Sequence, residues 1–125
     1  MPTTPEVART PEDLTRLFVQ RANQRDADGM AELYAPDAVL AYPHGQTTVG
    51  RPAIREVLAQ FVEHVPLPLP LEEPLPTVHY GELALTSTPS GDGTGIRVQV
   101  TRRQPDGSWL RVIDRPESNP PAAAS

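Results

Sequence analysis

LYAPDAVL at Leu33–Leu40 and GRPAIR at Gly50–Arg55 are the two stretches that decide the fold. In the first, Pro36 is expected to end a short helix, because proline lacks an amide hydrogen and clashes with the preceding helical turn. A β-like run, Ala38–Tyr42, follows it. In the second, Pro52 suits the first turn of a new helix. The chain therefore passes from helix to strand and back to helix within this region.

Three helices are predicted in the first half of the chain. The first spans Pro11–Arg25, with Thr10 as its cap and acidic residues in its first turn, where the helix dipole favours negative charge. The second begins at Asp26–Gly29, and the third opens at Gly50. Each has an apolar face at helical spacing. These faces carry Leu14, Leu17, Phe18 and Ala22 in the first helix, Met30, Leu33 and Tyr34 in the second, and Ile54, Val57, Leu58, Phe61, Val62 and Val65 in the third.

Strands dominate the second half. Beyond a short strand at Thr47–Val49, strands are predicted over Val78–Thr88, Ile96–Gln104 and Ser108–Arg115. The proline-rich segment Pro66–Pro76 is expected to be extended, its leucines covering the core. Because strands follow helices without alternating with them, we predict an α+β fold. Its three N-terminal helices would pack on a curved antiparallel sheet and form a cone-shaped pocket.

The last two predicted strands form a hairpin. Asp106-Gly107 is a strong signal for a two-residue turn, and such a turn places Gln99 opposite Asp114. Side chains alternate between the faces of a strand, so this register predicts which residues share a face. Arg97, Thr101, Leu110 and Val112 would lie beside Gln99 and Asp114, and Val98, Val100, Trp109 and Ile113 would lie on the opposite face.

Composition excludes several kinds of chemistry. The chain has 125 residues, no cysteine, and arginine as its only basic residue apart from histidine, which rules out thiolate nucleophiles and lysine Schiff bases. The net charge of −5 argues against nucleic-acid binding. The three histidines lack the spacing of a metal site, so neither metal nor cofactor is predicted.

One domain is predicted over residues 10–116, between a disordered arm (1–9) and a disordered tail (117–125). No apolar stretch is long enough to span a membrane, and the N-terminus lacks the pattern of a secretory signal. We therefore expect a cytoplasmic protein without a membrane partner.

The two opening stretches, together with Gly81–Thr88 and Arg102–Asp114, resemble the SnoaL-like branch of the nuclear transport factor 2-like superfamily. The resemblance covers roughly Pro11–Pro116. It implies a cystatin-like roll whose Gln99 face lines the pocket and whose other face serves a homodimer. It also implies a small hydrophobic ligand. The fold hosts isomerases, cyclases, epoxide hydrolases and binding modules, so it does not by itself specify a function.

Ketosteroid isomerase, one relative, uses a carboxylate base, a tyrosine and a protonated aspartate. An ungapped comparison places these three groups at Tyr42, Phe18 and Gln99. Phe18 cannot donate a hydrogen bond and Gln99 cannot titrate. The resemblance therefore implies the scaffold of this enzyme without its machinery, and leaves open whether the chain is an enzyme.

Asp114 is the first catalytic candidate, as a general acid or base in a dry pocket. The alternative is a carboxylate paired with Arg97 or Arg115 for structural reasons. Tyr42 could donate to a ligand oxygen, and His44 could move protons, although a turn histidine is usually exposed. The predicted pocket lining comprises Phe18, Tyr34, Tyr42, Arg97, Gln99, Val112 and Asp114.

Three functions agree with these patterns. The leading one is a dimeric domain that binds a small apolar molecule. The second is a cofactor-independent enzyme of the cyclase, isomerase or epoxide hydrolase type that uses Asp114. The third is a protein-interaction module built on Pro66–Pro76 and on the face with Val100 and Trp109.

Overall fold

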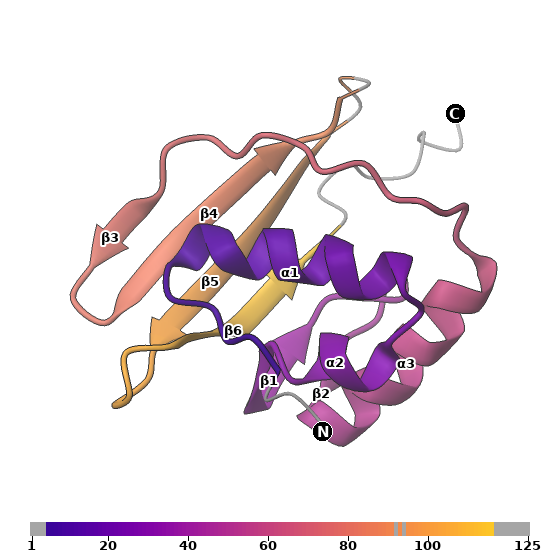
Figure 1. The fold of residues 1–125 in the computed structure, drawn as a ribbon, viewed down its shortest axis with the longest axis horizontal. Coiled ribbons are helices and arrows are strands. Elements are labelled where there is room, and N and C mark those ends of the chain that lie inside the picture. Colours follow the sequence, from indigo (N-terminus) through magenta and orange to yellow (C-terminus); the bar gives the residue numbers. More distant parts are fainter. Residues whose placement is uncertain (1–4, 92, 94, 117–125) are drawn as a thin grey trace.

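Six strands form one mixed sheet, and three helices lie on one of its faces. The structure is a computed structural model that describes residues 5–91, 93 and 95–116. The strand order is β2-β1-β6-β5-β4-β3, and only β1 and β6 run parallel. The predicted α+β class is confirmed (Figure 1). The elements are α1 (Pro11–Asn23), α2 (Ala27–Ala31), β1 (Tyr34–Leu40), β2 (Thr48–Val49), α3 (Arg51–His64), β3 (Val78–Tyr80), β4 (Leu83–Pro89), β5 (Ile96–Arg103) and β6 (Trp109–Arg115).

The helices begin where the sequence predicts. The Thr10 hydroxyl accepts a hydrogen bond from the Asp13 amide and caps α1, and Pro11 occupies its first turn. Helix α1 ends at Asn23, before the predicted Arg25, because Arg25 adopts a φ of 56°, which a right-handed helix cannot continue. Helix α3 buries Ile54, Leu58 and Val62 on one face, as its spacing predicts.

The prediction around Pro36 was wrong. Helix α2 ends at Ala31, and Tyr34 and Pro36 belong to strand β1 rather than to the helix. The pairing of β1 with β6 shifts between Tyr34 and Val39, and proline is tolerated in strands at such irregularities. Tyr34 is therefore the first residue of a buried strand, facing the interior of the molecule.

The segment Val78–Thr88 was predicted as one strand and is two. Strands β3 and β4 form a hairpin whose turn contains Gly81 and Glu82. Gly81 has a φ of 59°, a left-handed conformation that glycine adopts without strain. The hairpin gives the sheet a short edge strand, β3.

The predicted pairing of Gln99 with Asp114 is confirmed, but the predicted two-residue turn is not formed, because the pairing shifts by one residue between Val100 and Thr101, on the side toward the turn. Val100 faces Ile113 and Thr101 faces Arg111, so Val112 is an extra residue in β6, as in a β-bulge. Arg111 consequently shares the face of Gln99 and Asp114, where Leu110 and Val112 were expected. Trp109 was predicted on the opposite face and is instead buried.

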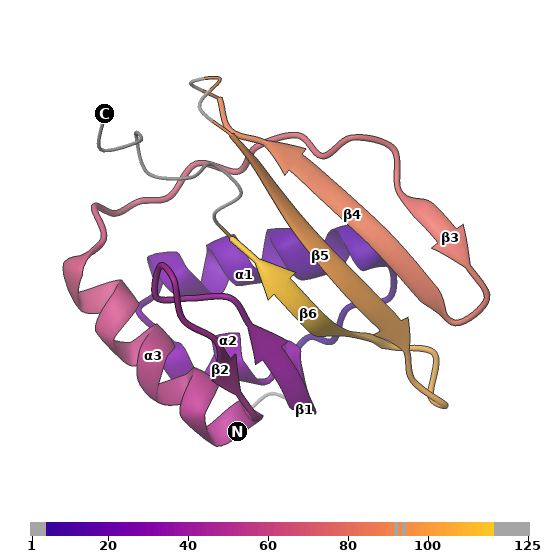
Figure 2. The same ribbon diagram turned by 180° about the vertical axis from the view of Figure 1, so that it is seen from behind.

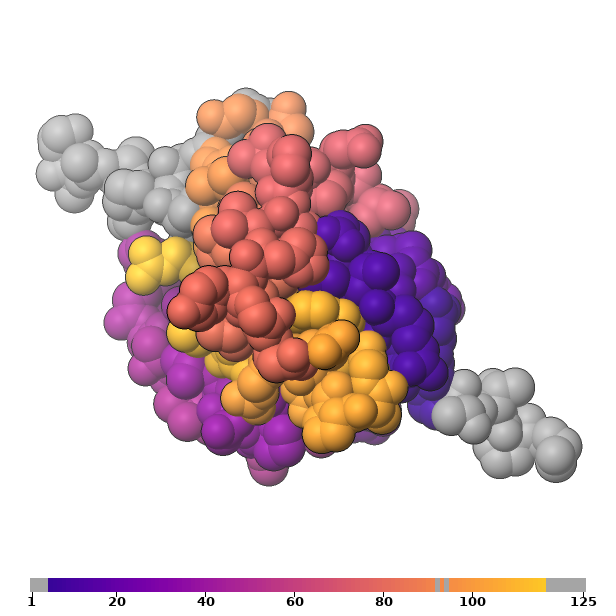
Figure 3. Space-filling view, turned by 90° about the vertical axis from the view of Figure 1, so that its left-hand side faces the viewer, coloured from indigo at the N-terminus to yellow at the C-terminus, as the bar shows by residue number. Residues whose placement is uncertain are grey.

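The helices cover the inner face of the sheet, and its outer face is uncovered over β3–β6 in the reverse view (Figure 2). Seen from the β3 end, α1 packs against residues of the β3–β4 hairpin and of the β5–β6 hairpin (Figure 3). The space between α1 and the sheet is therefore covered at this end.

None of the helices in the described residues is long and apolar enough to cross a bilayer.

The segment Pro66–Pro76 runs from α3 back across the layer of α1 to β3 without forming a strand of its own (Figure 1). Leu69 packs against the core, whereas Leu71 and Leu75 are exposed, so the leucines cover the core only in part.

Of the predicted arm, residues 1–4 lie outside the described residues. Its later part has Ala8 buried, with its carbonyl accepting a hydrogen bond from the Trp109 amide. The predicted tail, residues 117–125, also lies outside the described residues.

Candidate functional site

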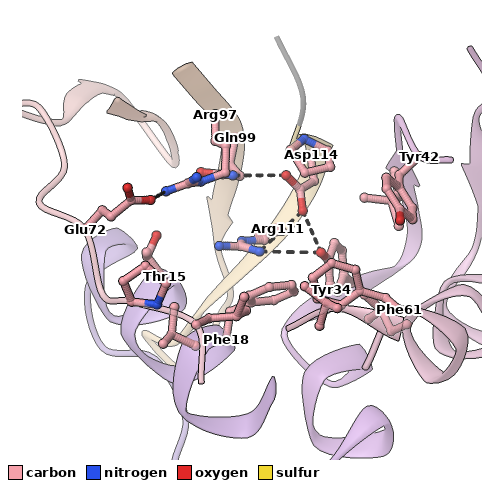
Figure 4. A pocket seen from close by; sticks show the side chains of 17 residues that line it. Thr15, Phe18, Tyr34, Tyr42, Phe61, Glu72, Arg97, Gln99, Arg111 and Asp114 are labelled. Atoms are coloured by element: carbon pink, nitrogen blue, oxygen red, sulfur yellow. Dashed lines mark hydrogen bonds and ion pairs between the residues drawn. The ribbon is translucent and has the colours of Figure 1, made fainter. Parts of the chain in front are cut away.

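A pocket of about 300 Å³ lies between α1, α3 and the inner face of the sheet (Figure 4). Its apolar wall includes Phe18 of α1, Phe61 of α3 and Tyr42, which follows β1. Phe61 lies between the other two rings, with centroids 6.5 Å from Phe18 and 6.1 Å from Tyr42. The remaining lining residues are Thr15, Val19, Tyr34, Leu40, Leu58, Val65, Leu69, Pro70, Glu72, Arg97, Gln99, Arg111, Asp114 and Pro116.

One end of this pocket is polar and buried, and Asp114 is its centre. The Tyr34 hydroxyl donates a hydrogen bond of 2.6 Å to Oδ2 of Asp114, and the Gln99 amide nitrogen donates one of 3.0 Å to Oδ1. The Thr86 hydroxyl in turn donates to the Gln99 amide oxygen at 3.0 Å. Strands β1, β4, β5 and β6 thus each supply one member of this network.

Arg111 completes the network and supplies its positive charge. Its Nη1 lies 3.3 Å from Oδ2 of Asp114 and 3.4 Å from the Tyr34 hydroxyl oxygen. Its guanidinium carbon lies 4.7 Å from the centre of the Phe18 ring, within the range of a cation–π contact. Both charged side chains are almost fully buried. The Arg111–Asp114 pair is therefore a desolvated ion pair in the wall of a largely apolar pocket.

Burial and neighbouring charges keep Tyr34 and Arg111 protonated. Burial raises the pKa of the Tyr34 phenol well above its ordinary value, and the charge of Asp114 raises it further. Burial opposes the charge of Arg111, but attraction to Asp114 and the hydrogen bond to Tyr34 outweigh it, so the pKa of Arg111 is raised. At neutral pH Tyr34 is a hydrogen-bond donor and Arg111 a cation.

A second ion pair closes one side of the pocket. Glu72, in the segment after α3, pairs with Arg97 of β5 and also accepts a hydrogen bond from the Gly91 amide. Both side chains of the pair are only partly exposed. Leu69 and Pro70 of the same segment line the pocket. This segment therefore forms a side wall that is held to the sheet by charge.

Six of the seven residues predicted to line the pocket do so: Phe18, Tyr34, Tyr42, Arg97, Gln99 and Asp114. Val112 does not, because the bulge gives its place to Arg111. His44, predicted as a catalytic candidate, lies exposed in the loop after β1 and is not part of the lining. Phe18, Tyr42 and Gln99, the positions aligned with the three ketosteroid isomerase groups, all lie in this pocket.

Sequence reasoning missed Arg111 as a site residue. Asp114 was considered as a possible partner of Arg97 or Arg115, and the structure pairs it with Arg111 instead. One signal was present, because Arg111 is a charged residue inside the apolar run Leu110–Ile113. Among the described residues no group of histidines, aspartates and glutamates could hold a metal ion.

Comparison with known proteins agrees with this fold. The SnoaL-like domain matches residues 15–115 of the chain. No curated protein sequence matches it at a significant level.

Solved structures show the same fold at low sequence identity. A ketosteroid isomerase-like protein from Erwinia carotovora atroseptica superposes with a TM-score of 0.67 at 18% identity, over 83% of this chain and 89% of that one. An NTF2-like protein from Pseudomonas putida gives a TM-score of 0.62 at 20% identity, over 82% and 80%. An NTF2-like protein with a cystatin-like fold from Novosphingobium aromaticivorans gives 0.59 at 18% identity, over 83% and 76%. Since the family match extends over most of its length, this chain belongs to the SnoaL-like domain family, with the NTF2-like fold.

Proposed function

We propose that this domain binds a small, largely apolar molecule in the pocket between α1, α3 and the sheet. One observation carries the proposal: a pocket of about 300 Å³ with an aromatic and aliphatic wall ends on a buried, hydrogen-bonded ion pair. Pockets of this size, apolar with a few convergent polar groups, are typical ligand sites.

The energetics of the polar end support a role in binding. Taking two charges out of water is unfavourable, and buried ion pairs are often no better for stability than apolar residues of similar volume. The inner face of the sheet nevertheless buries Thr86, Gln99, Thr101, Arg111 and Asp114. A sheet face that only had to pack against helices would be expected to be apolar. These residues are better explained as the polar end of a ligand site.

A thermal-shift screen tests the proposal, using steroids, aromatic polyketides, terpenoid epoxides and fatty acids. A ligand present at 100 times its Kd stabilises a folded protein by about 2.7 kcal/mol, which raises the Tm of a domain this size by several degrees. Val65→Trp should abolish the shift, because Val65 lines the pocket and a larger ring there occupies the ligand's space. Val49→Trp is the matched control, since Val49 is exposed on β2. A flat response to every class would count against the proposal.

A second candidate function is acid/base catalysis by Asp114 on the bound molecule. The observation that favours it is that Asp114 is a carboxylate, 2% exposed, in the wall of the pocket, where it can reach a bound molecule. The carboxylate could take a proton from a bound molecule and return it at another atom. Asp114→Asn should then abolish turnover while the thermal shift with the same compound persists. Unchanged turnover in this variant would remove Asp114 from the mechanism.

We also propose that the domain forms a homodimer through the outer face of the sheet. Val78, Leu85, Val100 and Ile113 are paired in one row across β3, β4, β5 and β6, and three of them are exposed large apolar side chains. The interaction-module alternative loses part of its basis, because Trp109 is buried.

A further inference from the structure

Arg111 uses only part of its hydrogen-bonding capacity, although its side chain is 4% exposed. Nη1 contacts Asp114 and Tyr34. Nε is buried without a partner, and Nη2 has no hydrogen bond to any residue within 5–91, 93 and 95–116. Buried polar groups are nearly always hydrogen-bonded, so an arginine that leaves half of its fork unpaired requires an explanation.

The free part of this side chain belongs to the pocket. Figure 4 shows the guanidinium of Arg111 in the middle of the lining residues, with Asp114 and Tyr34 on one side and Thr15 and Glu72 on the other. Phe18 lies against the guanidinium at 4.7 Å and limits its movement. The unpaired Nη2 is therefore a donor held in place before any ligand arrives.

The charges of the pocket indicate what this donor can receive. Asp114 already neutralises Arg111, and Glu72 already neutralises Arg97. A further charge brought into the buried end would have no counter-charge, which is strongly unfavourable in an apolar environment. The hydroxyl of Tyr34 and the amide nitrogen of Gln99 both donate to Asp114. The capacity left over is donor capacity, most of it on Arg111 and one N–H on Gln99.

We propose that the pocket selects uncharged apolar molecules that carry a hydrogen-bond-accepting oxygen, such as a carbonyl or ether oxygen, and that Nη2 of Arg111 is the donor that determines this specificity. The inference rests on the proposed binding function and adds the chemistry of the ligand. Arg111 orients the molecule by its oxygen while Phe18 and Phe61 contact its apolar body.

Three naphthalenes of similar size provide the test: 2-acetylnaphthalene has a neutral carbonyl, 2-ethylnaphthalene has no oxygen, and 2-naphthoate has a charged pair of oxygens. Their Kd values are measured by titration calorimetry at one pH and salt concentration. The ketone should bind about tenfold more tightly than the hydrocarbon, the contribution of a hydrogen bond to a charged donor. The anion should bind more weakly than the ketone.

A conservative variant identifies the donor. Arg111→Lys keeps the charge that Asp114 requires but loses the planar fork and its Nη2. In this variant the Kd values of the ketone and the hydrocarbon should be about equal, and the hydrocarbon should still bind. Arg103→Lys is the matched control, at an exposed ion pair outside the pocket, and should keep the preference.

The outcomes separate this inference from the function on which it rests. If none of the three compounds binds the unaltered protein, the pocket proposal itself is contradicted. Equal Kd values for ketone and hydrocarbon leave the pocket intact and overturn the role of Arg111, as does a preference that survives in a folded Arg111→Lys protein. Tightest binding of the anion overturns the selection for an uncharged ligand. Circular dichroism establishes that the variants fold, and if Arg111→Lys does not fold, the series on the unaltered protein decides.

Discussion

Tyr34 shows how one side chain can serve both packing and chemistry. Its ring is fully buried at the start of β1, and its hydroxyl joins Asp114 and Arg111 at the end of the pocket. A hydroxyl buried this deeply must donate to a partner, and the partner here is charged. At this residue the fold and the candidate site depend on the same atoms, so a single substitution can test both.

Tyr34→Phe should lower the free energy of unfolding by about 1–3 kcal/mol, because it removes one donor from a buried carboxylate and leaves the ring in place. Urea denaturation at neutral pH measures the change. Tyr80→Phe, at a residue that is 83% exposed, serves as the control and should leave stability unchanged. Equal stability of the two variants would mean that the network around Asp114 contributes little to folding.

The raised pKa of Tyr34 also predicts a dependence of stability on pH. In the unfolded chain the phenol loses its proton near its ordinary value of about 10, while in the folded protein burial keeps it protonated at higher pH. The folded state therefore binds more protons in this window, and stability is complete below about pH 10 and falls as pH rises above it. Tyr34→Phe should show a shallower loss of stability than the unaltered protein between roughly pH 9.5 and 11. Parallel curves would contradict the assignment.

Among the elements, β6 shows most clearly what sequence patterns can and cannot predict. The two-residue turn predicted at Asp106-Gly107 does not form, since Arg103 faces Trp109 beside it, and Gln99 faces Asp114 only because the extra residue at Val112 shifts the pairing back by one. The bulge at Val112 could not be predicted, since nothing in Leu110–Ile113 distinguishes an extra residue from a regular strand. The prediction that Pro36 ends a helix was also wrong, because proline ends helices but is tolerated in irregular strands as well. Local signals thus predicted most element types and six of the 17 residues that line the pocket, whereas the position of Arg111 depended on tertiary structure.

The segment between α3 and β3 should depend on its ion pair. Glu72→Gln removes the charge that faces Arg97. The Leu75 amide, which bonds the segment to the carbonyl of Ser87, should then exchange about fivefold faster. This factor corresponds to the loss of roughly 1 kcal/mol from a partly buried ion pair. Hydrogen exchange followed by NMR measures it. Glu82→Gln is the matched control, because Glu82 pairs with Arg103 in an exposed position at the other end of β5. If both variants left the rate at Leu75 unchanged, the segment would be held by Leu69 and its hydrogen bonds to Asn23.

The whole molecule has two sheet faces with different roles. The inner face supports the helices and carries the polar end of the pocket, and the outer face carries Leu85 in a row of apolar side chains across four strands. Exposed apolar surface that continues over several strands is typical of interaction sites. If two copies associate here, each pocket remains on the far side of its own sheet.

Leu85→Glu should convert a dimer to a monomer, because it places a charge in the middle of the apolar row. Light scattering coupled to size-exclusion chromatography measures the mass. Val49→Glu is the control, since Val49 is exposed on β2 at the opposite edge of the sheet. A monomeric unaltered protein at all concentrations would contradict the proposed dimer.

The bulge in β6 affects how this strand can be compared with the last strand of a relative. In a regular strand, residues three apart point to opposite faces, so Arg111 and Asp114 could not both face the pocket without the extra residue at Val112. A substitution at position 111 of a straight strand would place the new side chain on the outer face, because only a one-residue shift in the pairing with β5 brings positions 111 and 114 to the same face. A comparison with a relative whose last strand is straight must therefore treat the two sides of Val112 separately, because the residues on one side lie on the opposite face from those at the same spacing in a straight strand.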